Sequence, residues 1–429
     1  DFLSQNEDIN LSKIYWDAFT QVSTPGGERY PSVTDEINGS IFNGALTFCY
    51  LGHGGPSGWA QERVLQVKDI DNWSNERSFP LFVTATCSFA SIDDPEVFSA
   101  GEKVLVSEHG GIGLFTTCRA VYSSDNTRLT TAVFDFMTAE DSNGKLLTLG
   151  EILRRAKNNS PTDTVDVNAR KFLLLGDPSM NLLYPQNEVY TTHINDVELA
   201  SQAFTDTISA LSEMKIKGYV GSNGSITSGF DGEIWVTVFD KRTTRSTLAQ
   251  DPRSLSKNFK EQRNLLFKGK AKVTAGQFEL AFIVPKDILF QIGQGKISYY
   301  ASDGGDDARG SYNDFLVGGS SNNPVEDDIP PYVQVFMNDE NFVSGGQTDE
   351  NPIIFAKISD DLGINLSGSS VGHDLTGTLD GTSEKTYFLN DFYESELNNF
   401  SQGVVRYPLA KLETGEHKIT VRAWDIANN

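Results

Sequence analysis

The chain has little cysteine, little positive charge and no long apolar run. Only Cys49, Cys87 and Cys118 are cysteines, which excludes a disulfide scaffold, and an odd number leaves at least one thiol unpaired. The chain has 35 Lys and Arg residues and 58 Asp and Glu residues, which gives a net charge of −23. This charge argues against nucleic acid as a partner, because phosphates need a basic surface. No run approaches the roughly 18 apolar residues of a membrane helix. An extracytoplasmic protein that uses divalent cations fits this composition, and so does an acidic surface that only maintains solubility.

Residue patterns divide the 429 residues into an α/β segment and two β-rich segments. Up to Pro185, short apolar runs typical of strands buried on both faces of a parallel sheet alternate with helical patterns. The expected strands lie at 44–51, 79–86, 111–118 and 169–185, and the expected helices at 35–44, 99–109, 127–138 and 148–159, the last capped by Thr148. This alternation predicts an open sheet over 1–185 with ligands at the carboxyl ends of its strands.

After Pro185 the pattern changes to alternating strands separated by Gly, Asn and Asp turns. Such a pattern is typical of β-sandwiches, and we expect one over 186–320. A linker rich in Gly, Ser and acidic residues, 318–331, leads into a second expected sandwich over 321–429, which ends inside a predicted strand. Because the chain also begins without Met, we interpret it as a piece of a longer protein.

Two motifs place chemically active side chains after successive strands. His53 follows the first strand within "GHGGPSG", where glycines let the backbone turn sharply, and Cys87 ends the next strand. If the two strands are parallel neighbours, both side chains emerge at one sheet edge, and the imidazole can take the thiol proton to form a nucleophilic thiolate. The backbone N–H groups of Cys87 and Gly54 are then candidates to bind an oxyanion. The alternative is a buried structural cysteine and a turn histidine that caps a strand.

The other cysteines and histidines carry no comparable pattern. Cys49 and Cys118 lie in apolar runs and are expected to be small buried hydrophobic residues. Trp59 could line a substrate cleft beside the histidine loop, or it could be a packed loop aromatic. No zinc site is expected, because the remaining histidines lack metal-ligand spacing. These histidines are His109, His193, His373 and His417.

Acidic residues in two loops are candidates to bind calcium. Asp93, Asp94 and Glu102 follow the cysteine and could bind calcium or steer a basic substrate, although solvated or helix-capping carboxylates explain them better. Asp303 and Asp306 in "SDGGDDARG" form a loop of oxygen ligands without EF-hand spacing. The predicted chemistry requires no cofactor, so calcium is an optional ligand.

The motifs "YLGHGG", "FVTATCSF" and "LLGDPSMNLLYP" resemble the gingipain-type cysteine peptidases, whose fold is caspase-like. The stretches "FASIDDPEVFSAGEKVL", "VPKDILFQIGQGKISYYA" and "VRAWDIANN" are similar to one branch of that family, the PorU-type sortases of the type IX secretion system in Bacteroidetes. The resemblance implies a caspase-like domain with a mostly parallel sheet over 1–185, followed by two Ig-like β-sandwiches. It also implies that Cys87 and His53 form a catalytic dyad.

The family has an upstream subdomain that contributes an acidic partner for the histidine. Seven carboxylates near His53 in the sequence are available, and none has a motif that recommends it, so the role stays open. They are Asp8, Asp17, Glu28, Asp35, Glu36, Glu62 and Asp69.

The resemblance further implies an activity at the extracellular face of the outer membrane. A sortase of this branch cleaves the C-terminal signal domain from secreted cargo through a thioester, and an amine of anionic lipopolysaccharide accepts the cargo. The outer-membrane protein PorV is the implied partner that holds the sortase there. Two alternatives remain open: a secreted gingipain-like endopeptidase, and a catalytically inactive adhesin or secretion scaffold.

Overall fold

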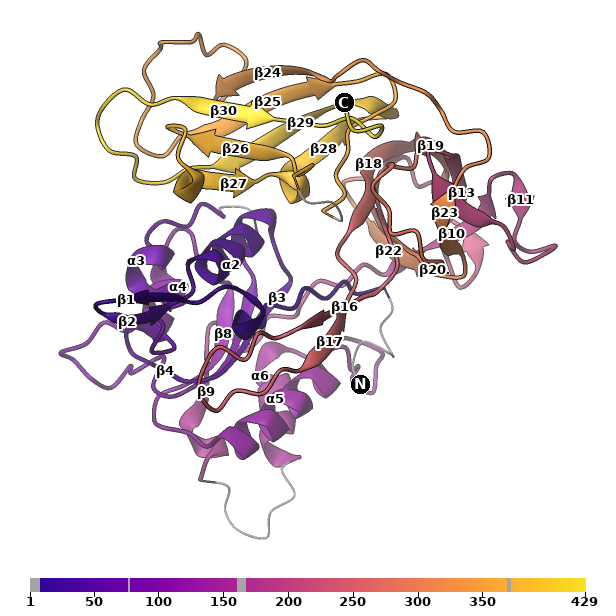
Figure 1. Cartoon of the computed structure of the whole chain (residues 1–429). Coiled ribbons are helices and arrows are strands. Elements are labelled where there is room, and N and C mark those ends of the chain that lie inside the picture. Colours follow the sequence, from indigo (N-terminus) through magenta and orange to yellow (C-terminus); the bar gives the residue numbers. More distant parts are fainter. Residues whose placement is uncertain (1–7, 76–77, 160–166, 369–371) are drawn as a thin grey trace.

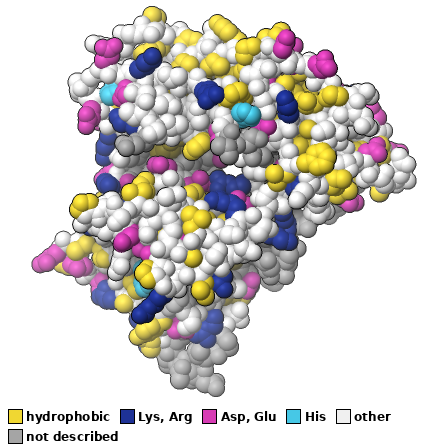
Figure 2. All heavy atoms as spheres, in the orientation of Figure 1, with side chains coloured by type: hydrophobic (Ala, Val, Ile, Leu, Met, Phe, Trp, Pro, Cys, Tyr) yellow, Lys and Arg dark blue, Asp and Glu magenta, His cyan; other side chains and the backbone are white. Residues whose placement is uncertain are grey.

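The structure, a computed structural model, describes residues 8–75, 78–159, 167–368 and 372–429. An α/β unit and two β-rich units make up the molecule, as Figure 1 shows. Acidic side chains are scattered over the face drawn in Figure 2, so the negative charge is spread across the units. No helix within the described residues has the length and apolar character needed to cross a membrane.

A four-stranded sheet forms the centre of the α/β unit. Its strands are β3 (Thr47–Leu51), β7 (Leu81–Ala85), β8 (Gly113–Thr117) and β9 (Phe172–Leu175), in that spatial order. The first three are parallel, and β9 is antiparallel to β8. The predicted mostly parallel sheet is therefore confirmed, and each of the four expected ranges contains one of these strands.

Both faces of this sheet are buried, because successive residues of β7 enter different cores. Leu81, Val83 and Ala85 pack in one core with α5 and α6, while Phe82 packs in the other with α2 and α4. The helices are α2 (Pro31–Asn43), α3 (Val67–Ile70), α4 (Ala100–Val106), α5 (Ser123–Met137) and α6 (Leu149–Asn158). Burial on both faces explains why the strand sequences read as continuous apolar runs.

Side-chain caps set the starts of two helices. Thr148 accepts the backbone N–H of Glu151 at 3.3 Å at the start of α6, as the sequence predicts. Ser99 and Glu102 form a reciprocal capping box at the start of α4, where Glu102 accepts the N–H of Ser99 at 2.9 Å. Glu102 is therefore a helix-capping carboxylate, and its assignment as a calcium candidate gives way to that alternative.

The first β-rich unit wraps a nine-stranded sheet around one core. Seven strands follow the order β14–β13–β10–β22–β21–β15–β18, while β11 pairs with β10 and β19 with β13. The strands are β10 (Asn187–Ile194), β11 (Val197–Glu198), β13 (Glu213–Ser222), β14 (Ser225–Ile226), β15 (Gly232–Phe239), β18 (Leu265–Val273), β19 (Gln277–Ile283), β21 (Lys296–Ser302) and β22 (Asp307–Tyr312). A smaller sheet contains β12 (Thr207–Ala210), β23 (Leu316–Ser320) and β20 (Gly293–Gln294).

The second β-rich unit places two sheets around one core. One sheet contains β24 (Tyr332–Met337), β25 (Ile353–Ser359), β29 (Asn399–Pro408) and β28 (Tyr393–Glu396). The other contains β27 (Thr386–Phe388), β26 (Thr376–Leu379) and β30 (Ile419–Arg422). Both β-rich units are thus largely antiparallel sheet, while their Ig-like topology and the domain limits 186–320 and 321–429 stay predictions.

A β-hairpin of the first β-rich unit reaches along the α/β unit (Figure 1). We call residues 243–261, with β16 (Thr243–Ser246) and β17 (Asn258–Glu261), the arm. The carboxylate of Asp17 accepts the backbone N–H groups of Ala249 and Gln250 at 3.0 and 3.2 Å. Next to Asp17, Trp16 packs against Tyr50 of β3 with ring centroids 6.0 Å apart. The arm therefore holds the stretch that covers the strand leading to His53.

The remaining short elements lie near the start of the chain or between strands. They are β1 (Val22–Thr24), β2 (Gly27–Arg29) and the 3-10 helices η1 (Trp16–Ala18), η2 (Ala169–Lys171), η3 (Ser383–Lys385) and η4 (Asn390–Phe392).

Candidate active site

Strands β3 and β7 bring the two predicted catalytic residues to the same edge of the sheet. The strands are parallel neighbours, and Leu51 pairs with Ala85 at their carboxyl ends. His53 and Cys87 each follow two residues after this last pair, where neighbouring strands are spaced about 4.8 Å apart. The condition on which the predicted dyad depends, parallel neighbouring strands that end at one edge, is therefore met.

The histidine loop lies close to the cysteine turn at Gly54, whose backbone approaches the side chain of Thr86. A Cβ atom added to Gly54 would lie 2.6 Å from Oγ1 of Thr86 and 3.0 Å from the carbonyl oxygen of Gly58. Thr86 directly precedes Cys87 and is buried, and its carbonyl accepts a hydrogen bond from the hydroxyl of Thr117. Glycine is needed at position 54 because any side chain would push these two loops apart.

The histidine loop is a small sheet of β4 (Gly54–Gly55), β5 (Gly58–Trp59) and β6 (Leu65–Gln66). The carbonyl of His53 accepts the N–H of Ala60 at 2.8 Å and the hydroxyl of Tyr50 at 2.7 Å, so the backbone of His53 is fixed while its side chain is exposed. Antiparallel pairs alternate between hydrogen-bonded and non-hydrogen-bonded types. Because His53 and Ala60 form a hydrogen-bonded pair, the next pair, Gly54 with Trp59, is non-hydrogen-bonded. The N–H of Gly54 thus points away from the hairpin, as an oxyanion donor requires.

Cys87 lies in a tight turn whose geometry is unusual for its sequence. Ser88 has a φ of 50°, a left-handed conformation that few residues other than glycine adopt, and such backbone strain concentrates at functional sites. The N–H of Ser88 donates to the carbonyl of Arg119 at 3.2 Å, which joins the turn to the loop after β8. From the same loop, the N–H of Val121 donates to Sγ of the half-buried Cys87 at 3.4 Å. The thiol of Cys87 in turn donates to the carbonyl of Val121 at 3.7 Å, so both backbone groups of Val121 hold the sulfur in place.

Neither Ser88 nor Val121 is marked by the sequence as a residue of the site. Val121 contributes only its backbone N–H, so no residue type marks its role. The left-handed conformation of Ser88 had no signal either, because glycine is the residue that usually marks such a turn.

Trp59 is buried and does not line a cleft. Its side chain is only 1% exposed. The indole stacks on Tyr50 and Phe48, with ring centroids 4.3 and 5.8 Å away. Trp59 is therefore a packed loop aromatic, the alternative that the sequence left open, and its contacts attach the histidine loop to β3.

The three cysteines are free, and the expectation for Cys49 is wrong. Cys49 is exposed because β3 is an edge strand whose Cys49 and Leu51 side chains point to an uncovered face. Enough protein still surrounds the sulfur that desolvation raises the pKa of the Cys49 thiol to about 12. Cys118 is half-buried, and its thiol donates to the carbonyl of Lys171 at 3.4 Å.

The aspartates predicted as calcium candidates have other partners. Both oxygens of Asp93 bind the guanidinium of Arg119, with the longer contact at 2.6 Å, and this hydrogen bonding lowers the pKa of Asp93. Asp94 and Asp303 accept backbone N–H groups within their own turns, one of them the N–H of Asp306. None of these four aspartates belongs to a group of three metal-ligating side chains in the part of the chain that the structure describes. The geometry favours solvated and turn-capping carboxylates at these positions.

No acidic partner for His53 is assigned. Four of the seven available carboxylates have structural partners: Asp8 binds Arg309, Asp17 binds the arm, Glu36 binds Arg263, and Asp69 caps α3 through Gln66. Burial raises the pKa of Tyr50, and the charge of Glu62 raises it further. Glu62 is thus electrostatically close to the hydroxyl that binds the carbonyl of His53.

Comparison with known proteins points to one peptidase family. Residues 2–183 match the model of peptidase family C25. The chain is similar to the crystal structure of dimeric latent PorU from Porphyromonas gingivalis, with 30% identity over 75% of this chain and a TM-score of 0.35. It is also similar to the Arg-specific cysteine proteinase gingipain R, with 14% identity over 66% of this chain and 55% of that one and a TM-score of 0.32. The chain spans 30% of the length of the PorU chain, and no curated protein sequence matches it.

Proposed function

Because residues 2–183 of this chain belong to peptidase family C25, the gingipain-type cysteine peptidases, we propose that Cys87 is its nucleophile and His53 its general acid and base. One observation supports this assignment: β3 and β7 are parallel neighbours, and His53 and Cys87 each follow the carboxyl end of one of them by two residues. Contacts of Sγ with the N–H and the carbonyl of Val121 hold the sulfur in a fixed position beside the loop after β8.

The proposed reaction begins when Sγ of Cys87 attacks the scissile carbonyl carbon. The carbonyl oxygen becomes an oxyanion, which the N–H groups of Gly54 and Cys87 bind. The C–N bond then breaks as the protonated imidazole of His53 gives its proton to the leaving amine, and a thioester remains on Cys87. An incoming nucleophile attacks the thioester while His53 takes its proton, and the thiolate leaves.

The incoming nucleophile in our proposal is an amine rather than water. The cargo would lose its C-terminal signal domain to the thioester step, and an amine on anionic lipopolysaccharide would take the acyl group. The stretches after residue 186 that resemble the PorU-type sortases support this assignment over plain hydrolysis. The same resemblance supports a location at the extracellular face of the outer membrane with PorV as partner.

The test replaces Cys87 by alanine in the native host, with Cys49→Ala as the matched control. Cys49 lies in β3, the strand that leads to His53, but it is not part of the proposed dyad, so its loss should leave cargo processing unchanged. We expect the Cys87→Ala strain to accumulate cargo that keeps its signal domain and lacks the lipid-linked form, as mass spectrometry of the cargo would show. Normal processing in a well-expressed Cys87→Ala strain would refute the assignment and favour the scaffold alternative.

A second measurement separates sorting from hydrolysis. Purified protein is given a cargo peptide with and without a small primary amine, and the new C-terminus is weighed. A sortase yields the amide adduct when the amine is present. A free carboxylate under both conditions would instead favour the secreted endopeptidase.

A further inference from the structure

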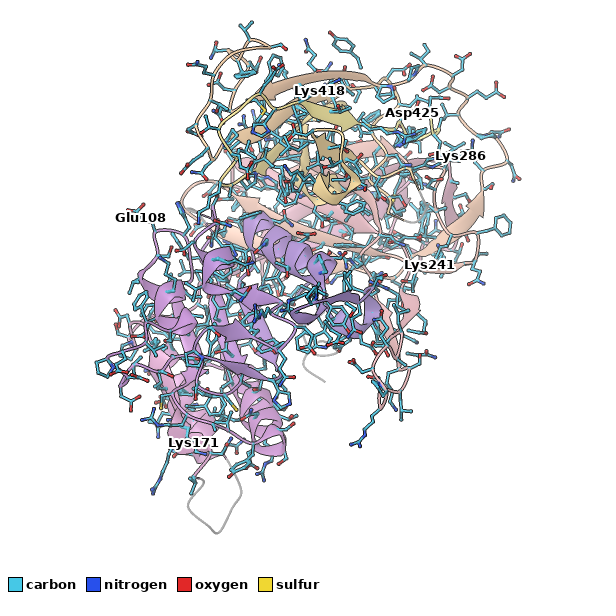
Figure 3. All side chains as sticks on the ribbon, turned by 60° about the vertical axis from the view of Figure 1, so that its left-hand side comes forward. Glu108, Lys171, Lys241, Lys286, Lys418 and Asp425 are labelled. Atoms are coloured by element: carbon cyan, nitrogen blue, oxygen red, sulfur yellow. The ribbon has the colours of Figure 1, made fainter. Side chains whose placement is uncertain are left out.

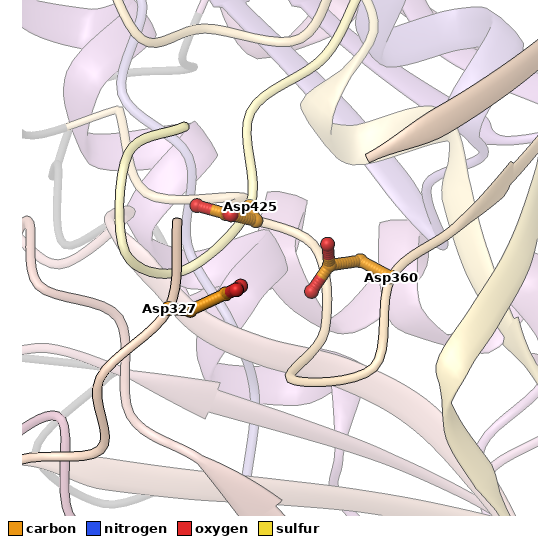
Figure 4. Close-up of side chains that lie close together, drawn as sticks. All are labelled: Asp327, Asp360 and Asp425. Carbon is orange, nitrogen blue, oxygen red and sulfur yellow. The ribbon is translucent and has the colours of Figure 1, made fainter. Parts of the chain in front are cut away.

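Three aspartates from separate stretches of the chain meet where the two β-rich units join. Asp327 comes from the linker between the units, Asp360 follows β25, and Asp425 follows β30. One carboxylate oxygen from each lies within 4.8 Å of the others, as the close-up in Figure 4 shows. Asp425 is 0% exposed and Asp360 is 8% exposed, so the cluster is largely shielded from solvent.

The local hydrogen bonds orient these carboxylates but leave one buried oxygen without a partner. Asp360 accepts the N–H groups of Leu362 and Gly363, and Oδ1 of Asp327 accepts the N–H of Ile329 at 3.0 Å. The second oxygen of Asp327, Oδ2, is buried and makes no hydrogen bond to any described residue. A buried carboxylate oxygen without a donor is costly, which points to a missing ligand beside it.

Within the residues that the structure describes, no Lys, Arg or His side chain forms an ion pair with these three carboxylates. The donors to Asp360 and Asp425 are backbone N–H groups and the side-chain amide of Asn429, all of them uncharged. Lys286 lies in the same region in Figure 3, but its ammonium donates to the carbonyl of Ala427. Three converging carboxylates without a positive partner repel one another, and a bound cation would reverse this cost.

We propose that Asp327, Asp360 and Asp425 bind a calcium ion. The three available groups are hard oxygen donors, which excludes a zinc site of the usual nitrogen and sulfur type. Mg²⁺ demands near-ideal octahedral geometry and keeps several waters, whereas Ca²⁺ accepts several carboxylates from irregular loops. The site differs from the loops around Asp93 and Asp303, whose carboxylates are engaged elsewhere.

The ion would connect the linker, through Asp327, to the second β-rich unit, through Asp360 and Asp425. The side chain of Asn429 already donates to the carbonyl of Asp327 and to Oδ2 of Asp425, both at 2.9 Å. The backbone N–H of Lys286 donates to the carbonyl of Ile426 at 2.8 Å, which ties the first β-rich unit to the same corner. Calcium would therefore fix the angle between the two β-rich units rather than take part in catalysis.

The test adds CaCl₂ to chelator-treated protein and measures binding by calorimetry and stability by thermal unfolding. Extracellular calcium modules bind with a Kd of roughly 10⁻⁴ to 10⁻³ M, so the titration must extend to about 10 mM, a tenfold margin over that range. We expect saturable binding to one site and a rise in unfolding temperature that MgCl₂ does not reproduce. Asp327→Asn should weaken binding by roughly tenfold or more, because the site loses a charged ligand.

Matched controls distinguish this site from loose binding to an acidic surface. Asp328→Asn changes the exposed neighbour of Asp327, and Asp306→Asn changes the other acidic loop, so both should bind like the parent chain. Asp327 is less buried than Asp360, which makes Asp327→Asn the safer variant for folding. Absence of saturable binding in the parent chain, or equal binding in Asp327→Asn, would overturn the proposal.

Catalysis gives an independent readout. Figure 3 places Asp425 at the opposite end of the molecule from Lys171, whose ammonium binds the carbonyl of Ala120 in the loop beside Cys87. Loss of calcium binding in Asp327→Asn should therefore leave the labelling rate of Cys87 unchanged, and a failure of one proposal does not imply a failure of the other.

Discussion

Replacing Gly54 by alanine tests whether the close approach of its backbone to the Thr86 side chain keeps the histidine loop against the cysteine turn. The added methyl group would lie 2.6 Å from Oγ1 and 3.2 Å from Cγ2 of Thr86, and 3.0 Å from the carbonyl oxygen of Gly58. Ordinary contacts of a Cβ atom begin at 3.4 Å. Thr86 is buried and its backbone carbonyl is bonded to Thr117, while the Gly58 carbonyl belongs to the loop backbone, so we expect the added methyl group to disturb the packing of the two loops.

The size of the effect differs between stability and catalysis. Overpacking of this kind costs about 1–3 kcal/mol of unfolding free energy, which a domain with a stability of roughly 5–15 kcal/mol can absorb. A displacement of about 1 Å between nucleophile and base lowers the rate about 100-fold. We therefore expect Gly54→Ala to fold and to lose most of its activity.

The assay compares Gly54→Ala with Gly55→Ala. An added Cβ at Gly55 would meet no atom within 4 Å, so this variant should keep the parent activity. Activity is measured as the rate at which iodoacetamide modifies Cys87, followed by peptide mass spectrometry, and as cargo processing in the host. Adding Thr86→Ala to Gly54→Ala removes both contacting atoms and should restore part of the rate.

Two outcomes would refute this reasoning. Full activity in a well-folded Gly54→Ala protein would show that the loops do not touch as described. Equal losses in Gly54→Ala and Gly55→Ala, without rescue by Thr86→Ala, would show that loop flexibility rather than close contact controls the site.

Three further predictions follow from the same structure. Iodoacetamide should modify Cys87 faster than Cys49 at neutral pH, although Cys49 is more exposed, because desolvation raises the pKa of Cys49 to about 12 and leaves little thiolate; faster modification of Cys49 would contradict an activated Cys87. Thr148→Ala should lower the unfolding free energy by about 1 kcal/mol, since α6 loses its N-cap, and Thr148→Ser serves as the control in thermal unfolding. Asp17→Ala should release the arm, because its carboxylate binds two arm N–H groups; limited proteolysis would then cut within 243–261 sooner than in the parent chain, and an unchanged cleavage pattern would show that the arm is held by other contacts.

Much of the α/β unit could be predicted from the sequence. Local features set the strands and helices: continuous apolar runs such as 81–85 can be buried only on both faces of a sheet, and Thr148 can cap only the helix that it precedes. The histidine and cysteine motifs could be found for the same reason, because each lies at the end of an apolar run. The resemblance to the gingipain-type peptidases, predicted from these motifs, is confirmed for the α/β unit by the match of residues 2–183 to the model of peptidase family C25.

The exposure of single side chains could not be predicted in this way. Cys49 and Trp59 both lie in the first strand and loop, yet Cys49 is exposed and Trp59 is buried. An apolar run does not state which strand lies at the sheet edge, and a loop aromatic carries no sign of the rings that will surround it. These properties depend on neighbours that are distant in sequence.

The sequence by itself determined the local elements, the two motifs and the family, because each depends on residues that are close along the chain. Only the tertiary structure decided that β3 and β7, the strands before His53 and Cys87, are parallel neighbours, and that Gly54 lies against Thr86. It also decided that Asp327, Asp360 and Asp425 meet, while the acids clustered in sequence, such as Asp93 and Asp94, do not form a site. The physical reason is the same in each case: strand pairing and loop packing join residues whose separation along the chain contains no signal of their contact.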